Sequence, residues 1–437
     1  MKVELAKEKK LSNSLKMIFT LPIISWALYD FANTIFSSNI ITIFFPFYLQ
    51  EVVGSNEVLN QIASTFISYA NAIASFLLVV FTPLYGVLID RKAQKKKYIV
   101  TFTLITVIAT VLMGIIARFP TENTFLQVPL HLLFVVLLFI IAKFFYHSSL
   151  VFYDSMISDV GQGKNISLVS GFGVAVGYVG TLVGLTVYLY VGNEDYHRAF
   201  IPSALLFFLF ALPLFFFVKE QNASIKPKPF SFFAGYKEIV VTFKEMKQYR
   251  SIFTFMVAYF FLNDAIATTI AMMAIYAKTI VGFSSGQFIL LYLFSTVSSI
   301  IGSFLFGIIS SKKGPYRSVH YVGLLLVIAL IMGTISTAEW QFWVAGSLFG
   351  VALGAMWVTS RALIVELTPE EKRGQFFGLF AFSGKISAII GPLIYGSITL
   401  VFASYGNIAS RLALSSLLIM ALIGLWVHRF VKREATE

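Results

Sequence analysis

The sequence predicts an all-α polytopic membrane protein with twelve transmembrane helices in two pseudo-symmetric six-helix halves. Three observations support this prediction. Hydrophobic residues make up 58% of the 437 residues and charged residues only 12%, whereas a soluble protein carries about 25% charged residues. Apolar runs long enough to cross a bilayer recur along the whole chain. Finally, glycine positions in the first half return in the second.

Each apolar run of roughly 20 residues can span the hydrocarbon core as a helix, because a helix satisfies its own backbone hydrogen bonds. The first run is too long for the apolar region of a signal peptide, so we expect it to be retained. The predicted spans are residues 23–50, 61–89, 98–118, 129–155, 167–191, 199–218, 250–280, 286–310, 318–337, 340–366, 375–403 and 407–431. The predicted domains are an N-terminal tail (1–22), a six-helix bundle (23–218), a cytoplasmic linker (219–249), a second bundle (250–431) and a C-terminal tail (432–437).

The net charge of +12 follows the predicted topology. Basic residues gather in the segments that alternate to one side, such as Arg91 to Lys97, Lys219 to Arg250 and Lys312 to Arg317. This asymmetry predicts that both termini are cytoplasmic, and we expect a multi-pass monomer in the cell's inner (plasma) membrane. The basic excess therefore needs no nucleic-acid partner.

The residue types needed for several kinds of chemistry are missing or scattered. The chain has no cysteine, and its five histidines stand singly, so the sequence predicts no metal site and no cofactor. No nucleophile and base converge near one membrane interface, which argues against a membrane-embedded enzyme.

An internal repeat links the predicted fourth and fifth spans to the tenth and eleventh. A shift of 207 positions aligns Asp159 with Glu366, Gly177 with Gly384 and Gly184 with Gly391 without a gap. Parallel six-helix repeats of this kind are typical of secondary transporters.

A loop motif follows the predicted second span. Gly86 to Arg91, followed by three lysines, resembles the signature of the major facilitator superfamily. Gly86 would permit close helix approach, and Asp90 could accept from a helix N-terminus and pair with an arginine. We therefore predict a cytoplasmic latch; an ordinary basic loop is the alternative. Its predicted members are Gly86, Asp90, Arg91, Asp154, Asp159 and Glu366.

Two further segments narrow the resemblance. The string Trp26 to Asn33 and the region from Ser360 through Gly391-Pro392 look like the autophagy-related vacuole effluxer family, a branch of the same superfamily. The resemblance implies a twelve-helix facilitator fold and, by analogy with fungal relatives, amino-acid efflux.

Ionisable residues inside spans cost roughly 2.5–3.5 kcal/mol each on insertion scales, and they usually face the bundle or a wet cavity. Lys143, His147 and Asp154 share one face of the fourth predicted span, because they stand at i, i+4 and i+11. In the facilitator fold the first, fourth, seventh and tenth helices line the central cavity, and the resemblance places one charged residue on each. The predicted substrate or ion-coupling residues are Asp30, Asn33, Lys143, His147, Asp264, Arg361 and Lys385. The alternative is that these charges form static pairs, such as Asp154 with Arg361.

The predicted function is secondary active transport of a small polar solute by alternating access, with amino acids as candidate substrates. The coupling ion is expected to be a proton at Asp264, because burial disfavours the charged form of a carboxyl group. Lys143 and Lys385 could bind an anionic group of the solute. The alternatives are export of a lipophilic compound or a lipid, and a transport-incompetent membrane receptor.

Overall fold

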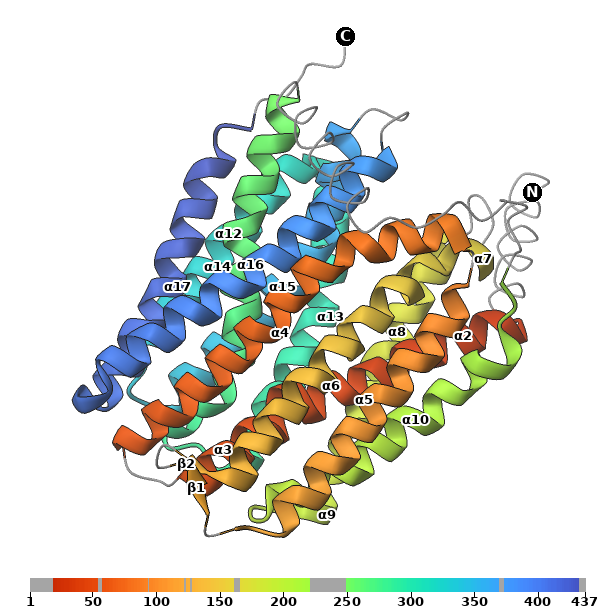
Figure 1. The fold of residues 1–437 in the computed structure, drawn as a ribbon. Coiled ribbons are helices and arrows are strands. Elements are labelled where there is room, and N and C mark those ends of the chain that lie inside the picture. The colour runs from red at the N-terminus through yellow and green to blue at the C-terminus, as the bar shows by residue number, and fades with distance from the viewer. Residues whose placement is uncertain are drawn as a thin grey trace, which may run out of the picture. The chain divides into compact units, whose positions relative to one another are not determined.

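The computed structural model describes residues 19–53, 57–92, 94–121, 123–125, 128–160, 166–220, 249–368 and 373–431 (Figure 1). These residues are almost entirely helical, with one short antiparallel pair formed by β1 (Thr124–Phe125) and β2 (Val128–Pro129). Most of the predicted tails at 1–22 and 432–437, and most of the predicted linker at 219–249, lie outside the described residues.

The helices follow the predicted spans closely. Those before the predicted linker are α2 (Leu21–Phe36), η1 (Ser37–Phe44), α3 (Phe45–Val53), α4 (Glu57–Lys92), α5 (Lys95–Arg118), α6 (Leu130–Ser155), α7 (Ile157–Val160), α8 (Ile166–Leu185), α9 (Val187–Val191), η3 (Tyr196–Ala199) and α10 (Phe200–Phe217). Those after it are α12 (Arg250–Tyr276), η4 (Ala277–Val281), α13 (Ser285–Lys313), α14 (Pro315–Ile335), α15 (Glu339–Leu367), α16 (Arg373–Val401), η6 (Ala403–Tyr405) and α17 (Asn407–His428).

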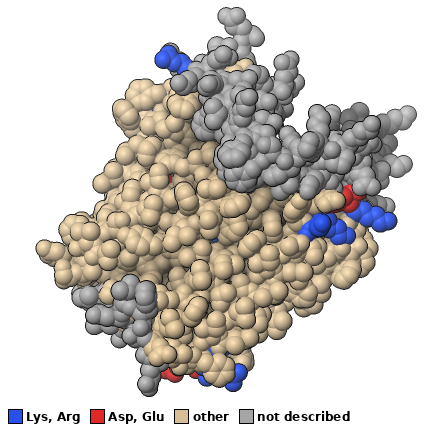
Figure 2. Space-filling model, in the orientation of Figure 1, with Lys and Arg blue, Asp and Glu red and all other residues tan. Residues whose placement is uncertain are grey.

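Length and composition support the predicted membrane fold. Within the described residues, 11 helical segments are long and apolar enough to cross a membrane. In the place of the remaining predicted span, 167–191, lie α8 and α9, with a shorter apolar stretch over Val176–Val191. The face seen in Figure 2 is dominated by uncharged side chains, as expected for a surface in contact with lipid.

Two spans contain π-helical turns. The first span is continuous from Leu21 to Val53 but passes through η1, and the seventh ends in η4. Within η1, the Thr42 hydroxyl donates to the carbonyl of Ser37 at 3.0 Å. Both spans also carry predicted site residues. This agrees with the general finding that π-helical turns are frequent at functional sites.

The chain packs into two compact units. The described part of the first unit comprises residues 19–44, 81–192 and 196–220, and that of the second comprises 45–80, 193–195 and 249–431. Residues 45–80 pack with the second unit: the Gln61 amide donates to the Ser410 hydroxyl at 3.0 Å, and the Thr65 and Thr399 hydroxyls lie 3.1 Å apart. The predicted boundaries of two sequential six-helix bundles remain a prediction.

Candidate functional site

In the first unit, α2 and η1 lie against α8 at three levels: Gly173, Gly177 together with Gly180, and Gly184. The Trp26 ring covers Gly173, where an added Cβ would come within 2.6 Å of the indole. One level further along, the Thr34 hydroxyl donates to the carbonyl of Gly177 at 2.5 Å. At the third level, the Asn39 amide donates to the carbonyl of Gly184 at 2.7 Å. Small residues thus let the two backbones approach closely.

In the second unit, α12 and α16 make the same set of contacts. The Phe255 and Phe380 rings stack with centroids 6.1 Å apart. The Asn263 amide donates to the carbonyl of Gly384 at 3.1 Å, as Thr34 does to Gly177. Gly391 then meets Asp264 and Thr268 on α12.

These contacts show which residues of α2 and α8 correspond to which residues of α12 and α16. The predicted shift of 207 relates α8 to α16, and a shift of 229 relates α2 to α12, so that Thr34 corresponds to Asn263. The same register makes Ile35 the counterpart of Asp264 and Asn39 that of Thr268. A carboxyl group therefore occupies a position in the second unit that an isoleucine fills in the first.

Asp264 is enclosed between α12 and α16. Its side chain is 0% exposed. One carboxyl oxygen, Oδ1, accepts from the Gly391 N–H at 3.0 Å and from the Thr268 hydroxyl at 3.3 Å. The other oxygen, Oδ2, is buried without a hydrogen-bond partner among the described residues. The sequence placed Asp264 inside a span but did not reveal Thr268 or Gly391 as its partners.

The predicted first-unit residues lie on α2 and α6. Asp30 is partly exposed beside Gly177, whereas Asn33 is buried at 2% exposure. Neither amide atom of Asn33 hydrogen-bonds to the described residues, although its backbone carbonyl accepts from the Tyr146 hydroxyl at 3.1 Å. Lys143 is buried one turn from Tyr146 on α6. The fold leaves the Asn33 amide available for a ligand or a water molecule.

The remaining predicted site residues differ in exposure. On α6, His147 is partly exposed and Asp154 is exposed; helix α6 is unbroken from Leu130 to Ser155, so both share the face of Lys143. On α15, Arg361 is exposed and its guanidinium lies 5.5 Å from the centre of the Trp357 ring. Lys385 is partly exposed on α16.

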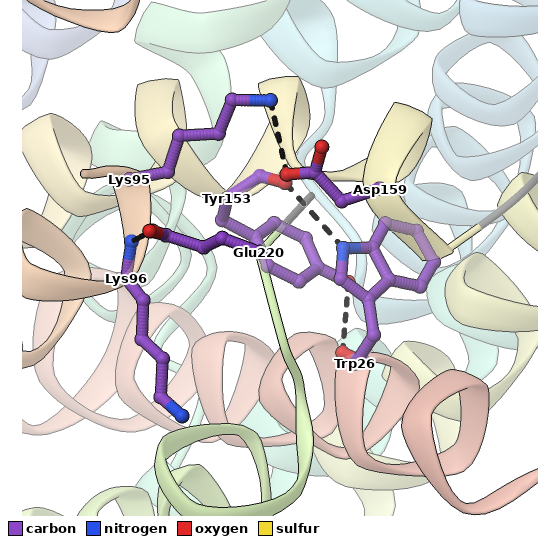
Figure 3. A network of polar contacts seen from close by, with 6 residues as sticks. All are labelled: Trp26, Lys95, Lys96, Tyr153, Asp159 and Glu220. Carbon is purple, nitrogen blue, oxygen red and sulfur yellow. Dashed lines mark hydrogen bonds and ion pairs between the residues drawn. The ribbon is translucent and has the colours of Figure 1, made fainter. Parts of the chain in front are cut away.

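The predicted latch is described only in part. Gly86, Asp90 and Arg91 lie within α4, but their side chains are outside the described residues, so their role stays a prediction. Asp159 on α7 forms an ion pair with Lys95 at 3.0 Å (Figure 3). Its repeat counterpart, Glu366, is exposed and has no ion-pair partner in the described part of the chain. The repeat therefore does not extend to this ion pair.

Figure 3 shows the polar contacts around this ion pair. The Trp26 indole donates to the carbonyl of Tyr153 at 3.4 Å, and the Tyr153 hydroxyl donates to the carbonyl of Trp26 at 3.1 Å. Glu220, just beyond α10, accepts from the backbone N–H of Lys96. Burial raises the pKa of Glu220, and this hydrogen bond partly opposes the rise.

Among the described residues, no group of three or more histidine or acidic side chains could hold a metal ion. The ionisable groups of the site come from several helices, namely α2, α6, α12, α15 and α16.

Comparison with known sequences identifies relatives along almost the whole chain. A family model described as "Vacuole effluxer Atg22 like" matches residues 22–436. An uncharacterized MFS-type transporter of Bacillus subtilis, YxiO, is 27% identical over 94% of this chain and 95% of its own length. An uncharacterized protein of Aquifex aeolicus is 23% identical over 94% of the chain and 97% of its own. Autophagy-related protein 22-1 of Aspergillus niger is 23% identical, with 57% of this chain matching 45% of that protein.

Solved structures show the fold. A mutant of the nucleoside transporter NupG superimposes with a TM-score of 0.74 at 12% identity, over 95% of this chain and 100% of that one. A bacterial homologue of the human lysosomal transporter Spinster, in an inward-facing and unoccupied conformation, gives a TM-score of 0.66 at 12% identity over 96% of each chain. The predicted facilitator fold is thereby confirmed. These relatives and neighbours include transporters and no named enzyme.

Proposed function

This chain belongs to the Atg22-like vacuole effluxer family, and we propose that it is a proton-coupled secondary transporter that moves a small polar solute by alternating access. The direction of transport, efflux, follows the family's description, and amino acids are the proposed substrate class by analogy with the fungal members. The bacterial relatives along the full chain support a place in the plasma membrane, and the asymmetry of the basic residues is the reason for proposing that both termini are cytoplasmic. We further propose that the protein is a monomer.

The observation that carries the proposal is the state of Asp264. An ionised carboxylate is very costly to bury without a counter-charge, and this one is 0% exposed with two neutral donors on Oδ1 and none on Oδ2. The neutral acid fits this position far better than the anion does. A group that must be protonated in one conformation and can release its proton in another is what proton coupling requires.

The first unit offers the polar groups that a solute would need. Lys143 supplies an amino group and Asn33 an amide whose oxygen and nitrogen are both unbonded among the described residues. A carboxylate would accept from both, and charge-assisted hydrogen bonds are roughly twice as strong as neutral ones. We therefore place a carboxylate of the solute near α2 and α6.

The test is transport by the purified protein in liposomes. Radiolabelled amino acids should accumulate against their gradient when a pH gradient of one polarity is imposed. In Asp264→Asn, accumulation should be lost while downhill exchange stays measurable. The matched control, Glu194→Gln, removes an exposed acid outside the predicted site and should behave as the wild type.

Three outcomes would overturn parts of the proposal. Undiminished accumulation in Asp264→Asn removes the coupling role of that residue. Transport confined to lipophilic compounds or lipids favours the alternative exporter. A folded protein that moves no member of either panel favours a receptor.

A further inference from the structure

We propose that Asp264, Gly391 and Pro392 form a proton-operated joint between α12 and α16, in which proton release from Asp264 opens the contact and α16 bends at Pro392. This inference rests on the proposed proton coupling and adds how the proton acts on the fold. It assigns Gly391 and Pro392 as positioning residues, which do not themselves touch the solute.

The joint is tightly closed in this structure. Asp264, Thr268 and Gly391 are all buried, and the Gly391 N–H donates to Asp264 Oδ1 at 3.0 Å. A Cβ added at Gly391 would collide with both the Thr268 hydroxyl and the Asp264 carboxyl. Only glycine therefore allows the backbone of α16 to approach the acid this closely.

The proton decides whether this closed contact is favourable. A protonated Asp264 carries its proton on one oxygen and no net charge, so it can stay buried at the cost of one unsatisfied O–H group. When the proton leaves to water, the carboxylate needs donors that the closed joint does not provide at Oδ2. The cost of keeping the carboxylate out of water then favours separation of the helices and entry of water.

Proline places a bend at the same level of α16. Pro392 follows Gly391 directly and lies inside the helix. Proline has no N–H, and its ring clashes with the carbonyl four residues earlier, so the helix is weakest there. Movement of α16 at Pro392 would change the contact that Gly391 makes with Asp264.

The first unit supplies an internal comparison. Its corresponding helix is interrupted at the same level: α8 ends at Leu185, the counterpart of Pro392, and α9 resumes at Val187. The residue opposite is Ile35, which cannot titrate, and Asn39 holds the carbonyl of Gly184. At this level the first unit has a break between two helices and the second has a proline inside a continuous helix, and only the second has an acid against it.

No other charged group takes part in the joint. Asp264 has hydrogen bonds only to Gly391 and Thr268 within the described residues, and no ion pair. Charged or titratable residues on α12 and the elements packed against it are Arg250, Tyr259 and Tyr276 on α12, Lys385 and Tyr395 on α16, Glu339, Arg361 and Glu366 on α15, Arg411 and His428 on α17, Tyr48 and Glu51 on α3, and Lys278 on η4. Among the described residues, none of these charged or titratable groups forms a hydrogen bond or an ion pair with Asp264.

The test uses single cysteines, for which the cysteine-free chain is a ready background. Thr268→Cys reports on the joint, and Asn39→Cys, its counterpart in the first unit, is the matched control. Maleimide labelling in liposomes is followed from acidic to alkaline pH, and the ratio of the two rates removes the titration of the thiol itself. We expect that ratio to rise severalfold with pH.

Three variants assign the effect. Asp264→Asn should abolish the rise, because the amide cannot lose a proton in this range. Pro392→Leu, which installs the first-unit residue, should also abolish it, together with gradient-driven accumulation, although Asp264 is intact. Pro392→Ala serves as a second variant, and each protein is checked for monodisperse elution before labelling.

The outcomes separate this inference from the proposed function. A pH-independent ratio in the wild type, or an unchanged rise in both folded Pro392 variants, overturns the joint while proton coupling at Asp264 can still hold. Normal accumulation by Asp264→Asn overturns the coupling itself. An equal rise at Asn39→Cys would show general loosening of the protein and would also refute the joint.

Discussion

The ion pair between Lys95 and Asp159 gives a quantitative test of the contact between α5 and α7 in the first unit. The two side chains are only 14% and 10% exposed, with Nζ and Oδ2 3.0 Å apart. Asp159→Asn keeps the shape of the side chain but removes its charge, and Lys95→Met keeps the stem of the lysine. We expect each single change to lower the free energy of unfolding and the double change to recover part of the loss.

The size of the effect follows from distance and burial. At 3.0 Å and an effective dielectric constant of about 20, Coulomb attraction amounts to about 5–6 kcal/mol. Desolvation of two largely buried ions offsets most of this gain. The side chains are nonetheless far less exposed than those of surface pairs, which contribute about 0.2–1 kcal/mol. We therefore expect a coupling energy of about 1–3 kcal/mol.

A double-mutant cycle measures this coupling. Unfolding in mixed micelles would be followed for the wild type, both single variants and the double variant. Glu366→Gln is the control, since the repeat counterpart of Asp159 is exposed and has no ion-pair partner among the described residues. A coupling energy below about 0.5 kcal/mol, comparable to exposed pairs, would refute the reasoning from burial.

Two further predictions concern a carboxyl group and a pair of amides. Burial raises the pKa of Glu220 above its ordinary value of 4.5. The contribution of Glu220 to stability is therefore complete below pH 4.5 and is lost as pH rises through the raised pKa. Glu220→Gln should flatten this part of the stability–pH profile, and an unchanged profile would contradict the prediction. The Asn39 amide donates to Gly184 and Ser203, so Asn39→Leu should lower the free energy of unfolding by about 1–3 kcal/mol. Asn33→Leu should leave stability unchanged or raise it, but should lower the affinity for the solute. A stability loss at Asn33 equal to that at Asn39 would show that the Asn33 amide is purely structural.

Apolar run lengths were enough to predict the helices, because the requirement for internal hydrogen bonding leaves few other structures in a bilayer. The predicted span of 250–280 corresponds to α12 with η4, ending at Val281. The π-helical turn within the first span was not predicted, since nothing in the apolar pattern distinguishes π from α geometry.

The candidate site was predictable in its charges but not in its partners. Asp264 was recognisable because an ionisable side chain inside an apolar span costs free energy to insert into the membrane. Its contact with Gly391 depends on the register between helices that are 127 positions apart, and no local pattern encodes that register. The sequence repeat did point toward this contact, because it aligned Gly184 with Gly391. The structure then shows that an acid lies against Gly391 but not against Gly184.

The two acids on the repeated helix pair, Asp30 and Asp264, also differ in their surroundings. Asp30 stands at the level of Gly177, where its counterpart in the second unit is Tyr259, and Asp264 stands at the level of Gly391, where the first unit has Ile35. Asp30 is partly exposed, so water or a solute can reach it without any movement of the helices, whereas Asp264 is sealed in the closed joint. An exposed carboxylate can remain charged and attract a cationic group of a solute, but a sealed one must exchange its proton when the joint opens. We therefore propose different tasks for the repeated helix pair in the two units: contact with the solute at Asp30 and proton exchange at Asp264.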